Sequence, residues 1–234
     1  RDEAGAVLGE YNKNISRPEF ILEEKLMETA FKMHPYSHTT MGYKNDILKY
    51  TERYQDVWPF FKKYYRPSNV SIVLVGDIDF KKMEVLVQTK FGKWKDPQIN
   101  VDKIPLEPDQ TEAKTIEFSI TKPTQTRMTI AYKIPEFSKN KKDIASLMIL
   151  SEMFFSTTSE FQKTFRYEKK WVDDVAATSS NALLPIENLD PGLWTITLRL
   201  TEAGKNKEKE LNQAVETTLA SVRNHVLSNE RLQA

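Results

Sequence analysis

Residues 64–79 read Tyr-Tyr-Arg-Pro-Ser-Asn-Val-Ser-Ile-Val-Leu-Val-Gly-Asp-Ile-Asp. Aromatic residues recur at helical spacing just before this stretch, and Pro67 ends that helix because proline lacks the backbone donor that would continue it. The run 70–75 is short and rich in β-branched residues, which is typical of a strand covered on both faces, although a buried helix has the same pattern. Gly76 ends the run, and Asp79 is a suitable cap for a following helix. The stretch therefore predicts a helix, a central strand and a second helix.

The overall composition is that of an ordinary globular protein. The 234 residues contain 34 Lys and Arg against 33 Asp and Glu, and the net charge of +1 gives no electrostatic case for nucleic acid or an anionic membrane. No apolar run approaches the roughly 20 residues of a membrane-spanning helix. The sequence has no cysteine, which excludes disulfides, thiolate catalysis and cysteine-based zinc sites.

Two helices are predicted at the N-terminal end. Residues 1–14 carry an apolar stripe at helical spacing, and Glu3 and Glu10 lie two turns apart on the same side of that helix. Ser16 is the predicted N-cap of the next helix, which has a proline in its first turn. That helix ends before His-Pro-Tyr, and the polar loop 34–42 is expected to be exposed.

A change of pattern marks a predicted boundary between two lobes. The segment 96–111 is polar, contains three prolines and shows neither helical nor strand periodicity. It is therefore the predicted linker between a first lobe, residues 1–95, and a second lobe, residues 112–234.

The second lobe alternates between strand-like and helix-like patterns. The predicted elements, in order, are strands at 114–121 and 127–133, helices at 144–155 and 161–169, strands at 172–178 and 193–200, and a helix at 211–226. This order predicts an α+β fold in which helices pack on one face of a largely antiparallel sheet.

Taken alone, these residues do not identify a functional site. The sequence contains neither a Gly-rich phosphate loop nor a serine nucleophile elbow. His34 and His38 have the four-residue spacing of a helical metal pair, but Pro35 lies between them, so helical geometry does not hold that spacing. Glu3 and Glu10 share one helix face, and such a pair is most often a solvated surface. The charged run that follows Arg166 is likewise more typical of an exposed helix end than of a binding site.

Several short motifs nevertheless occur together in a specific order. They are Glu-Ala-Gly-Ala-Val-Leu-Gly-Glu-Tyr at 3–11, Ala-Phe at 30–31, His-Pro-Tyr at 34–36, Gly42, Phe61, Tyr-Tyr-Arg-Pro-Ser-Asn at 64–69, Val-Gly-Asp-Ile-Asp at 75–79, Phe-Gly-Lys-Trp at 91–94, Phe-Gln-Lys-Thr-Phe-Arg at 161–166 and Asp-Pro-Gly-Leu-Trp at 190–194. In order and spacing they resemble the pitrilysin/insulinase (inverzincin) family of zinc metallopeptidases, over nearly the whole chain. The resemblance implies two homologous lobes of the mitochondrial-processing-peptidase-like type.

The resemblance also implies a zinc site, of which this sequence contains only part. In that family, two histidines of a His-x-x-Glu-His helix and a glutamate on a later helix hold Zn²⁺, and the glutamate between the histidines activates the bound water. Glu10 matches the third zinc ligand, and Glu3 matches a carboxylate that orients the ligands. The His-x-x-Glu-His sequence does not occur in the 234 residues. The general base and the other ligands are therefore expected upstream of Arg1, and this piece alone is expected to be inactive and to bind no zinc.

One departure from the family pattern concerns substrate binding. Family halves that bind substrate from across the chamber carry an arginine followed seven residues later by a tyrosine. Arg166 matches that arginine, but Asp173 stands where the tyrosine is expected. The departure indicates the zinc-bearing half and weakens a substrate-binding role for Arg166.

The resemblance leaves two functions open. One is part of a zinc endopeptidase that cleaves peptides or small unfolded proteins in a chamber formed by two homologous halves, on one chain or as separate subunits. The other is a non-catalytic structural or processing-complex subunit of the same family. The retention of Glu3 and Glu10 favours the peptidase. The chain opens without an initiator methionine, so truncation is expected at its start, and the second lobe is expected to be truncated at its end. Family members occur in periplasm, cytosol and organelles, which leaves the location open.

Overall fold

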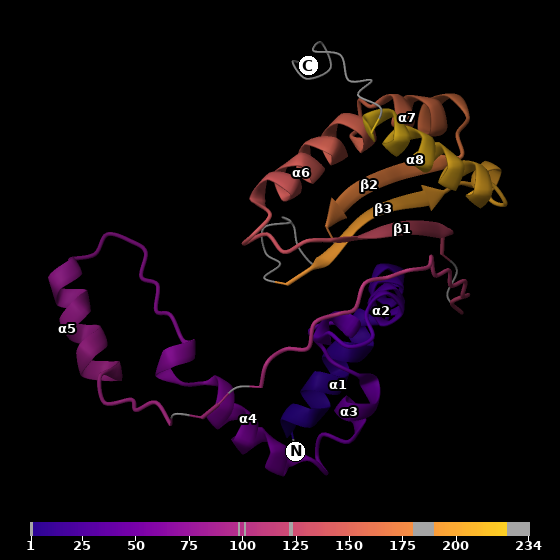
Figure 1. Ribbon diagram of the computed structural model, residues 1–234. Helices are drawn as coiled ribbons and strands as arrows, with labels where there is room; N and C mark the ends of the chain where they lie inside the picture. The colour runs from indigo at the N-terminus through magenta and orange to yellow at the C-terminus, as the bar shows by residue number, and fades with distance from the viewer. Residues whose placement is uncertain (1, 98, 101, 122–123, 180–189, 224–234) are drawn as a thin grey trace. The chain divides into compact units, whose positions relative to one another are not determined.

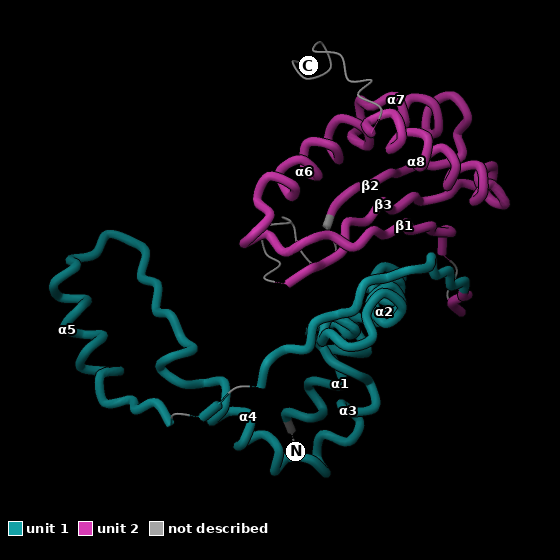
Figure 2. Tube along the Cα trace, in the orientation of Figure 1, with its two compact units in different colours: residues 1–117 teal, residues 118–234 magenta. Residues whose placement is uncertain are grey.

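A computed structural model describes residues 2–97, 99–100, 102–121, 124–179 and 190–223. The chain divides into two compact units, residues 1–117 and 118–234 (Figure 2). The segment 96–111, predicted as a linker, falls within the first unit. The described residues form helices and one antiparallel sheet, so the predicted α+β class is confirmed.

The second unit is a three-stranded antiparallel sheet with helices on one face (Figure 1). Its strands are β1 (Arg127–Ile134), β2 (Val172–Ser179) and β3 (Gly192–Leu200), in the order β1-β3-β2. Its helices are α6 (Lys141–Phe155), α7 (Glu160–Gln162), a π-helix at Lys163–Glu168 and α8 (Glu208–Arg223), with a short turn at Glu202–Gly204. The strands predicted at 127–133, 172–178 and 193–200 are confirmed, as are the helices predicted at 144–155 and 161–169. The helix predicted at 211–226 is confirmed up to Arg223, and its last three positions lie outside the described residues.

The helices cover the face of β3 that carries Trp194, Ile196 and Leu198, which are buried in the core. On the opposite face Leu193 and Thr195 are buried outside this core cluster, and Thr197 and Arg199 are only partly buried. The core also contains Leu200 of the same strand and apolar residues from β1, β2, α6, α7 and α8, namely Ile134, Ile144, Phe154, Phe155, Phe161, Val172, Val175, Leu211, Val215 and Leu219. A central strand that is apolar on one face therefore sets the position of the whole layer.

Two polar contacts fasten helices to this sheet. The indole Nε1 of Trp194 donates to Ser151 Oγ on α6 at 2.8 Å. The hydroxyl of Tyr132 donates to Glu216 Oε1 on α8 at 2.7 Å. Burial raises the pKa of Tyr132, and the Glu216 carboxylate raises it further. Both tyrosine and tryptophan thus bury a large ring while keeping their one donor paired.

The described part of the first unit is helical. It contains α1 (Asp2–Asn14), α2 (Pro18–Ala30), α3 (Lys44–Leu48), α4 (Val57–Tyr64) and α5 (Phe80–Phe91), with short 3₁₀ turns at Pro35–Ser37, Tyr54–Asp56 and Pro67–Asn69. The predicted cap of α5 is confirmed, since Asp79 Oδ1 accepts a hydrogen bond from the Lys82 backbone N–H at 3.1 Å. None of the helices in the described ranges is long and apolar enough to cross a membrane.

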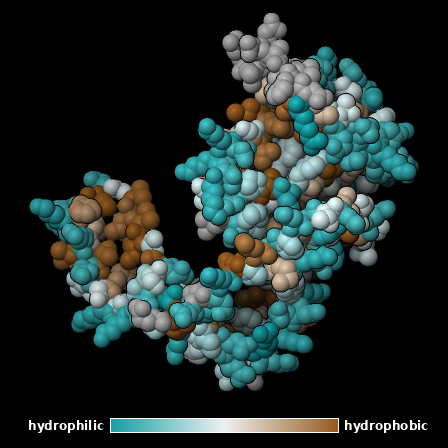
Figure 3. Space-filling model, in the orientation of Figure 1, coloured by the Kyte–Doolittle hydropathy of each residue, from teal (hydrophilic) through white to brown (hydrophobic). Residues whose placement is uncertain are grey.

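The predicted covered strand at 70–75 is wrong in this structure. The described residues of the first unit contain no β-strand, and Val73 and Val75 are 79% and 91% exposed. A strand forms only where a neighbouring strand accepts and donates its backbone hydrogen bonds, and no described segment of this unit fills that role. Figure 3 shows hydrophobic side chains gathered on the surface of the part of this unit that carries α5. The predicted strand at 114–121 is also absent, and Lys114 instead contacts α2.

Two further sequence expectations need correction. Ser16 does not cap α2, because the N-cap position is Arg17 and the Ser16 hydroxyl donates back to the Lys13 carbonyl at 2.7 Å. The loop 34–42 is not uniformly exposed, since His34 and Thr39 are buried. The His34 ring packs against that of Tyr36, with ring centroids 4.2 Å apart, which draws this part of the loop inward.

Candidate functional site

Helix α1 carries both carboxylates of the predicted metal site. Glu3 and Glu10 lie on one side of this helix and, at seven residues' separation, about 10 Å apart along its axis. Both residues are exposed. Their placement on a common helix face agrees with the sequence analysis. That either carboxylate binds or orients a metal stays a prediction.

Tyr11, the neighbour of Glu10, fixes which side of α1 faces outward. Tyr11 is 5% exposed, and its ring meets that of Phe20 on α2 edge-on, with centroids 6.2 Å apart. Its hydroxyl donates to Glu24 Oε2 at 3.2 Å. Consecutive helical residues point about 100° apart, so burying Tyr11 against α2 keeps Glu10 on the exposed side. The apolar stripe predicted this burial, but nothing in the sequence pattern identified Glu24 as the partner.

This buried link predicts an alkaline loss of stability. Burial and the hydrogen bond to Glu24 raise the pKa of Tyr11 from its ordinary 10.0 to about 12. Because the folded-state pKa is the higher one, the stabilisation is complete below about pH 10 and is lost as the pH rises towards about 12. We expect the free energy of unfolding to fall across this window, and to fall less steeply in Tyr11→Phe, which cannot ionise. Urea unfolding of both proteins at several alkaline pH values checks this. If the free energy of unfolding fell equally steeply with pH in both proteins, the prediction would be contradicted.

The described residues do not complete a zinc site. Within the described ranges, no three His, Asp or Glu side chains converge on a point where they would hold a metal ion. A carboxylate such as that of Glu10 suits Zn²⁺, but a catalytic zinc has three protein ligands. A carboxylate at Glu10 is at most one of these ligands, and its role as a ligand stays a prediction. His225 lies outside the described residues.

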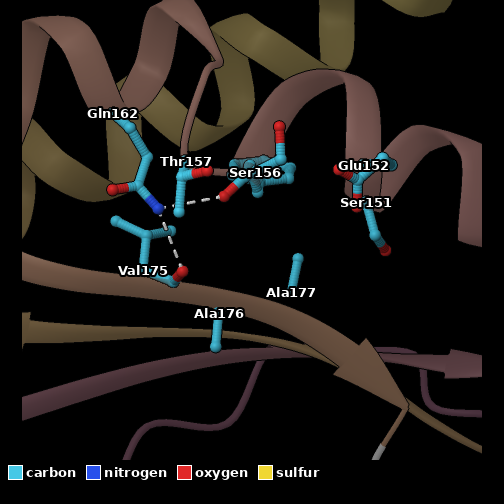
Figure 4. Close-up of a pocket in the computed structure, with 9 residues that line it drawn as sticks. Ser151, Glu152, Ser156, Thr157, Gln162, Val175, Ala176 and Ala177 are labelled. Atoms are coloured by element: carbon cyan, nitrogen blue, oxygen red, sulfur yellow. Dashed lines mark hydrogen bonds between the residues drawn. The ribbon is translucent and has the colours of Figure 1, made fainter.

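Arg166 lies on the π-helix, and its neighbour Gln162 lines a cavity of about 280 Å³ between α6 and β2 (Figure 4). Gln162 forms part of the cavity wall and is 1% exposed. Its amide Nε2 donates to the carbonyl oxygens of Phe155 and Val175, both at 3.2 Å. Arg166 Nη1 donates to Gln162 Oε1 at 3.3 Å. Through these bonds Gln162 links the π-helix to α6 and β2. The Gln162 amide and the Arg166 guanidinium therefore already have a structural role.

Asp173, which stands where the resemblance expects a tyrosine, is engaged within its own unit. Arg199 Nε donates to Asp173 Oδ1 and Gln125 Nε2 donates to Oδ2, both at 2.6 Å. Burial alone would raise the pKa of Asp173, but the bonds from Arg199 and Gln125 outweigh it and lower the pKa. The register of β2 shifts between Val172 and Asp174, which places Asp173 at an irregularity of the strand. The sequence shows the departure at this position, but these partners depend on the strand register, which the sequence does not specify.

Comparisons with known proteins agree with the resemblance. Residues 52–234 match the family described as Peptidase M16 inactive domain. Over 148 residues the chain is 28% identical to the zinc protease PqqE of Helicobacter pylori, an alignment that covers 62% of this chain and 32% of that protein. The chain therefore spans about a third of the length of this curated relative.

Solved structures share the fold. The crystal structure of a protease from Helicobacter pylori superposes with a TM-score of 0.82 at 22% identity, over 99% of this chain and 54% of that chain. The crystal structure of pitrilysin superposes with a TM-score of 0.68 at 16% identity, over 99% of this chain and 24% of that chain. At these identities the likeness concerns the fold.

Proposed function

The chain belongs to the Peptidase M16 inactive domain family, and from this membership we propose that it is part of a zinc-dependent endopeptidase that cleaves peptides or small unfolded proteins. The observation that carries the proposal is the arrangement on α1, where Glu3 and Glu10 are exposed on one side while Tyr11 is buried beside them. Because the buried Tyr11 holds α1 in place, the exposed carboxylate beside it is accessible to a metal ion. The name of the relative PqqE, a zinc protease, supports the same assignment.

In this proposal each site residue has a distinct role. Glu10 supplies one carboxylate ligand to Zn²⁺, and Glu3 orients the ligands around it. The general base and the other two ligands come from a part of the protein outside these 234 residues, so this chain alone is inactive. This chain corresponds to 54% of the Helicobacter pylori protease chain, and a parent protein of that length has room for these groups.

The proposed partners are a peptide substrate and a second, homologous half, on the same chain or on a separate subunit. The two halves would enclose a chamber that restricts substrates by size. A substrate contact by Arg166 stays a prediction. Its guanidinium lies over the ring of Tyr167 at 5.5 Å and donates to Gln162, which leaves it partly buried.

The alternative is a non-catalytic subunit of the same family. It is favoured by the description of the matching family as an inactive domain and by the extent of that match, residues 52–234. The match leaves out α1, which carries Glu3 and Glu10. The two functions therefore differ in whether the parent protein holds a metal on α1.

The deciding experiment measures zinc and hydrolysis in one preparation of the parent protein, extended upstream to include the region expected to carry His-x-x-Glu-His. We expect one zinc per chain and peptide cleavage that a chelator abolishes and added zinc restores. The 234-residue chain is the matched control and is expected to cleave nothing. A folded parent without zinc and without cleavage would reject the peptidase and support the non-catalytic subunit.

A further inference from the structure

Three consecutive backbone N–H groups converge on one carboxylate just after α2. The Lys32 N–H lies 3.0 Å from both Oε1 and Oε2 of Glu107. The Met33 and His34 N–H groups donate to Glu107 Oε2 at 2.8 and 3.0 Å. Glu107 comes from the segment predicted as a linker, at least 73 positions away along the chain.

This arrangement has the chemistry of an anion site. Successive backbone N–H groups that point into one concavity bind anions, and hydrogen bonds to a charged acceptor are stronger than those to a neutral one. The floor of this concavity is well packed, since Phe31 and His34 are 2% and 3% exposed and their rings lie 6.1 Å apart between centroids. The amides are therefore held in place around the carboxylate by buried side chains.

A second contact at the end of α2 comes from Lys114, three residues beyond the predicted linker 96–111. Lys114 Nζ donates to the Thr29 carbonyl oxygen, in the last turn of the helix, at 2.9 Å. An ammonium group is favoured at a helix C-terminus, where unpaired carbonyls carry partial negative charge. The Glu107 carboxylate thus accepts from backbone N–H groups, and the Lys114 ammonium donates to a backbone carbonyl.

Contacts nearer its start hold the same segment along the first unit. Asp102 forms an ion pair with Lys63 at 2.7 Å. Asp96 accepts from the Ser68 N–H at 3.0 Å. The described residues between 96 and 114 therefore contact the preceding part of the first unit at several separate points, which a free tether would not do.

We propose that the amides of residues 32–34 form a carboxylate-binding site, that Glu107 is its resident ligand, and that this site locks the segment 96–114 onto the end of α2 within the first unit. The inference is independent of the proposed peptidase. In this proposal the polar, proline-containing segment 96–111 is fixed in position and is not a flexible tether. It also predicts that the emptied site takes a small free carboxylate such as acetate or formate.

Amide hydrogen exchange on the 234-residue protein tests the lock. In Glu107→Ala we expect the N–H groups of Lys32, Met33 and His34 to exchange at least about tenfold faster, because each loses a charged acceptor. Glu107→Gln keeps a neutral acceptor of the same shape and is expected to lie between the two. Glu112→Ala removes an exposed glutamate from the same segment and is expected to leave these rates unchanged. Exchange in α1, which packs against α2 in the same unit, reports whether each variant remains folded.

Acetate and formate then test whether the site binds carboxylates. At constant ionic strength, either anion is expected to slow exchange of the three amides in Glu107→Ala saturably, and to have no effect on the wild type. Wild-type exchange rates in both Glu107 variants would overturn the lock. Faster exchange that neither acetate nor formate slows would overturn the carboxylate site.

Discussion

Glu10→Gln in the parent protein is expected to abolish peptide hydrolysis and to weaken zinc binding by more than about a hundredfold, beyond the range seen when residues around a ligand are changed. The amide has nearly the shape of the carboxylate but lacks its charge, so it is a poor ligand for Zn²⁺. Because Glu10 is exposed on α1, the substitution is not expected to disturb folding. Chelator competition measures the affinity for zinc, and thermal unfolding of the metal-free protein checks the fold.

Two matched substitutions sharpen this test. Glu3→Gln, on the same side of α1, is expected to cost about tenfold in zinc affinity, because it changes a residue that orients the ligands. Glu19→Gln removes an exposed glutamate from α2 and is expected to change neither zinc affinity nor hydrolysis. Full activity in Glu10→Gln would reject this residue as a ligand.

Gly204→Ala is expected to destabilise the second unit by roughly 2–4 kcal/mol, as overpacking against immovable atoms does. A Cβ at this buried glycine would overlap the carbonyl oxygen of Trp171 and lie 2.8 Å from its carbonyl carbon. These are backbone atoms, so no side-chain rotation relieves the clash. The same oxygen accepts the Thr201 N–H at 2.9 Å, and Trp171 directly precedes β2. Moving it would strain the point where Val172 pairs with Leu200.

Urea unfolding measures this loss against a control that adds the same methyl group elsewhere. Gly5→Ala places it on α1, where nothing lies within 4 Å of the new atom. Alanine is the better helix former, so this variant is expected to be neutral or more stable by up to about 1 kcal/mol. A Gly204→Ala protein as stable as the wild type would show that the approach to Trp171 is looser than the structure has it.

The sequence predicted the second unit well because the partners of each element lie within the chain. The alternation of β3 is satisfied by β1 and β2 on its edges and by helices over Trp194, Ile196 and Leu198. The same reasoning failed at 70–75. The run has the apolar pattern of a strand, but the described residues of the first unit contain no strand with which it could pair. Periodicity reports what a segment prefers, whereas a strand also needs a neighbour.

The candidate site divides in the same way. Local spacing was enough to place Glu3 and Glu10 on one side of α1. The contacts of Tyr11 with Glu24, of Asp173 with Arg199 and of Glu107 with the amides of residues 32–34 join positions far apart in the sequence. Such pairs depend on strand register and helix packing, which a single sequence does not specify.

The exposed run at 70–75 has a consequence for how the isolated chain behaves in a concentrated solution. A β-prone, mostly apolar segment that is exposed and forms no strand pairing within its own unit is a template for pairing with an identical segment of another molecule. Copies of the chain would then compete with any intended neighbour for the same hydrogen bonds. During synthesis, chaperones bind exposed apolar segments of this kind until a neighbouring strand pairs with them.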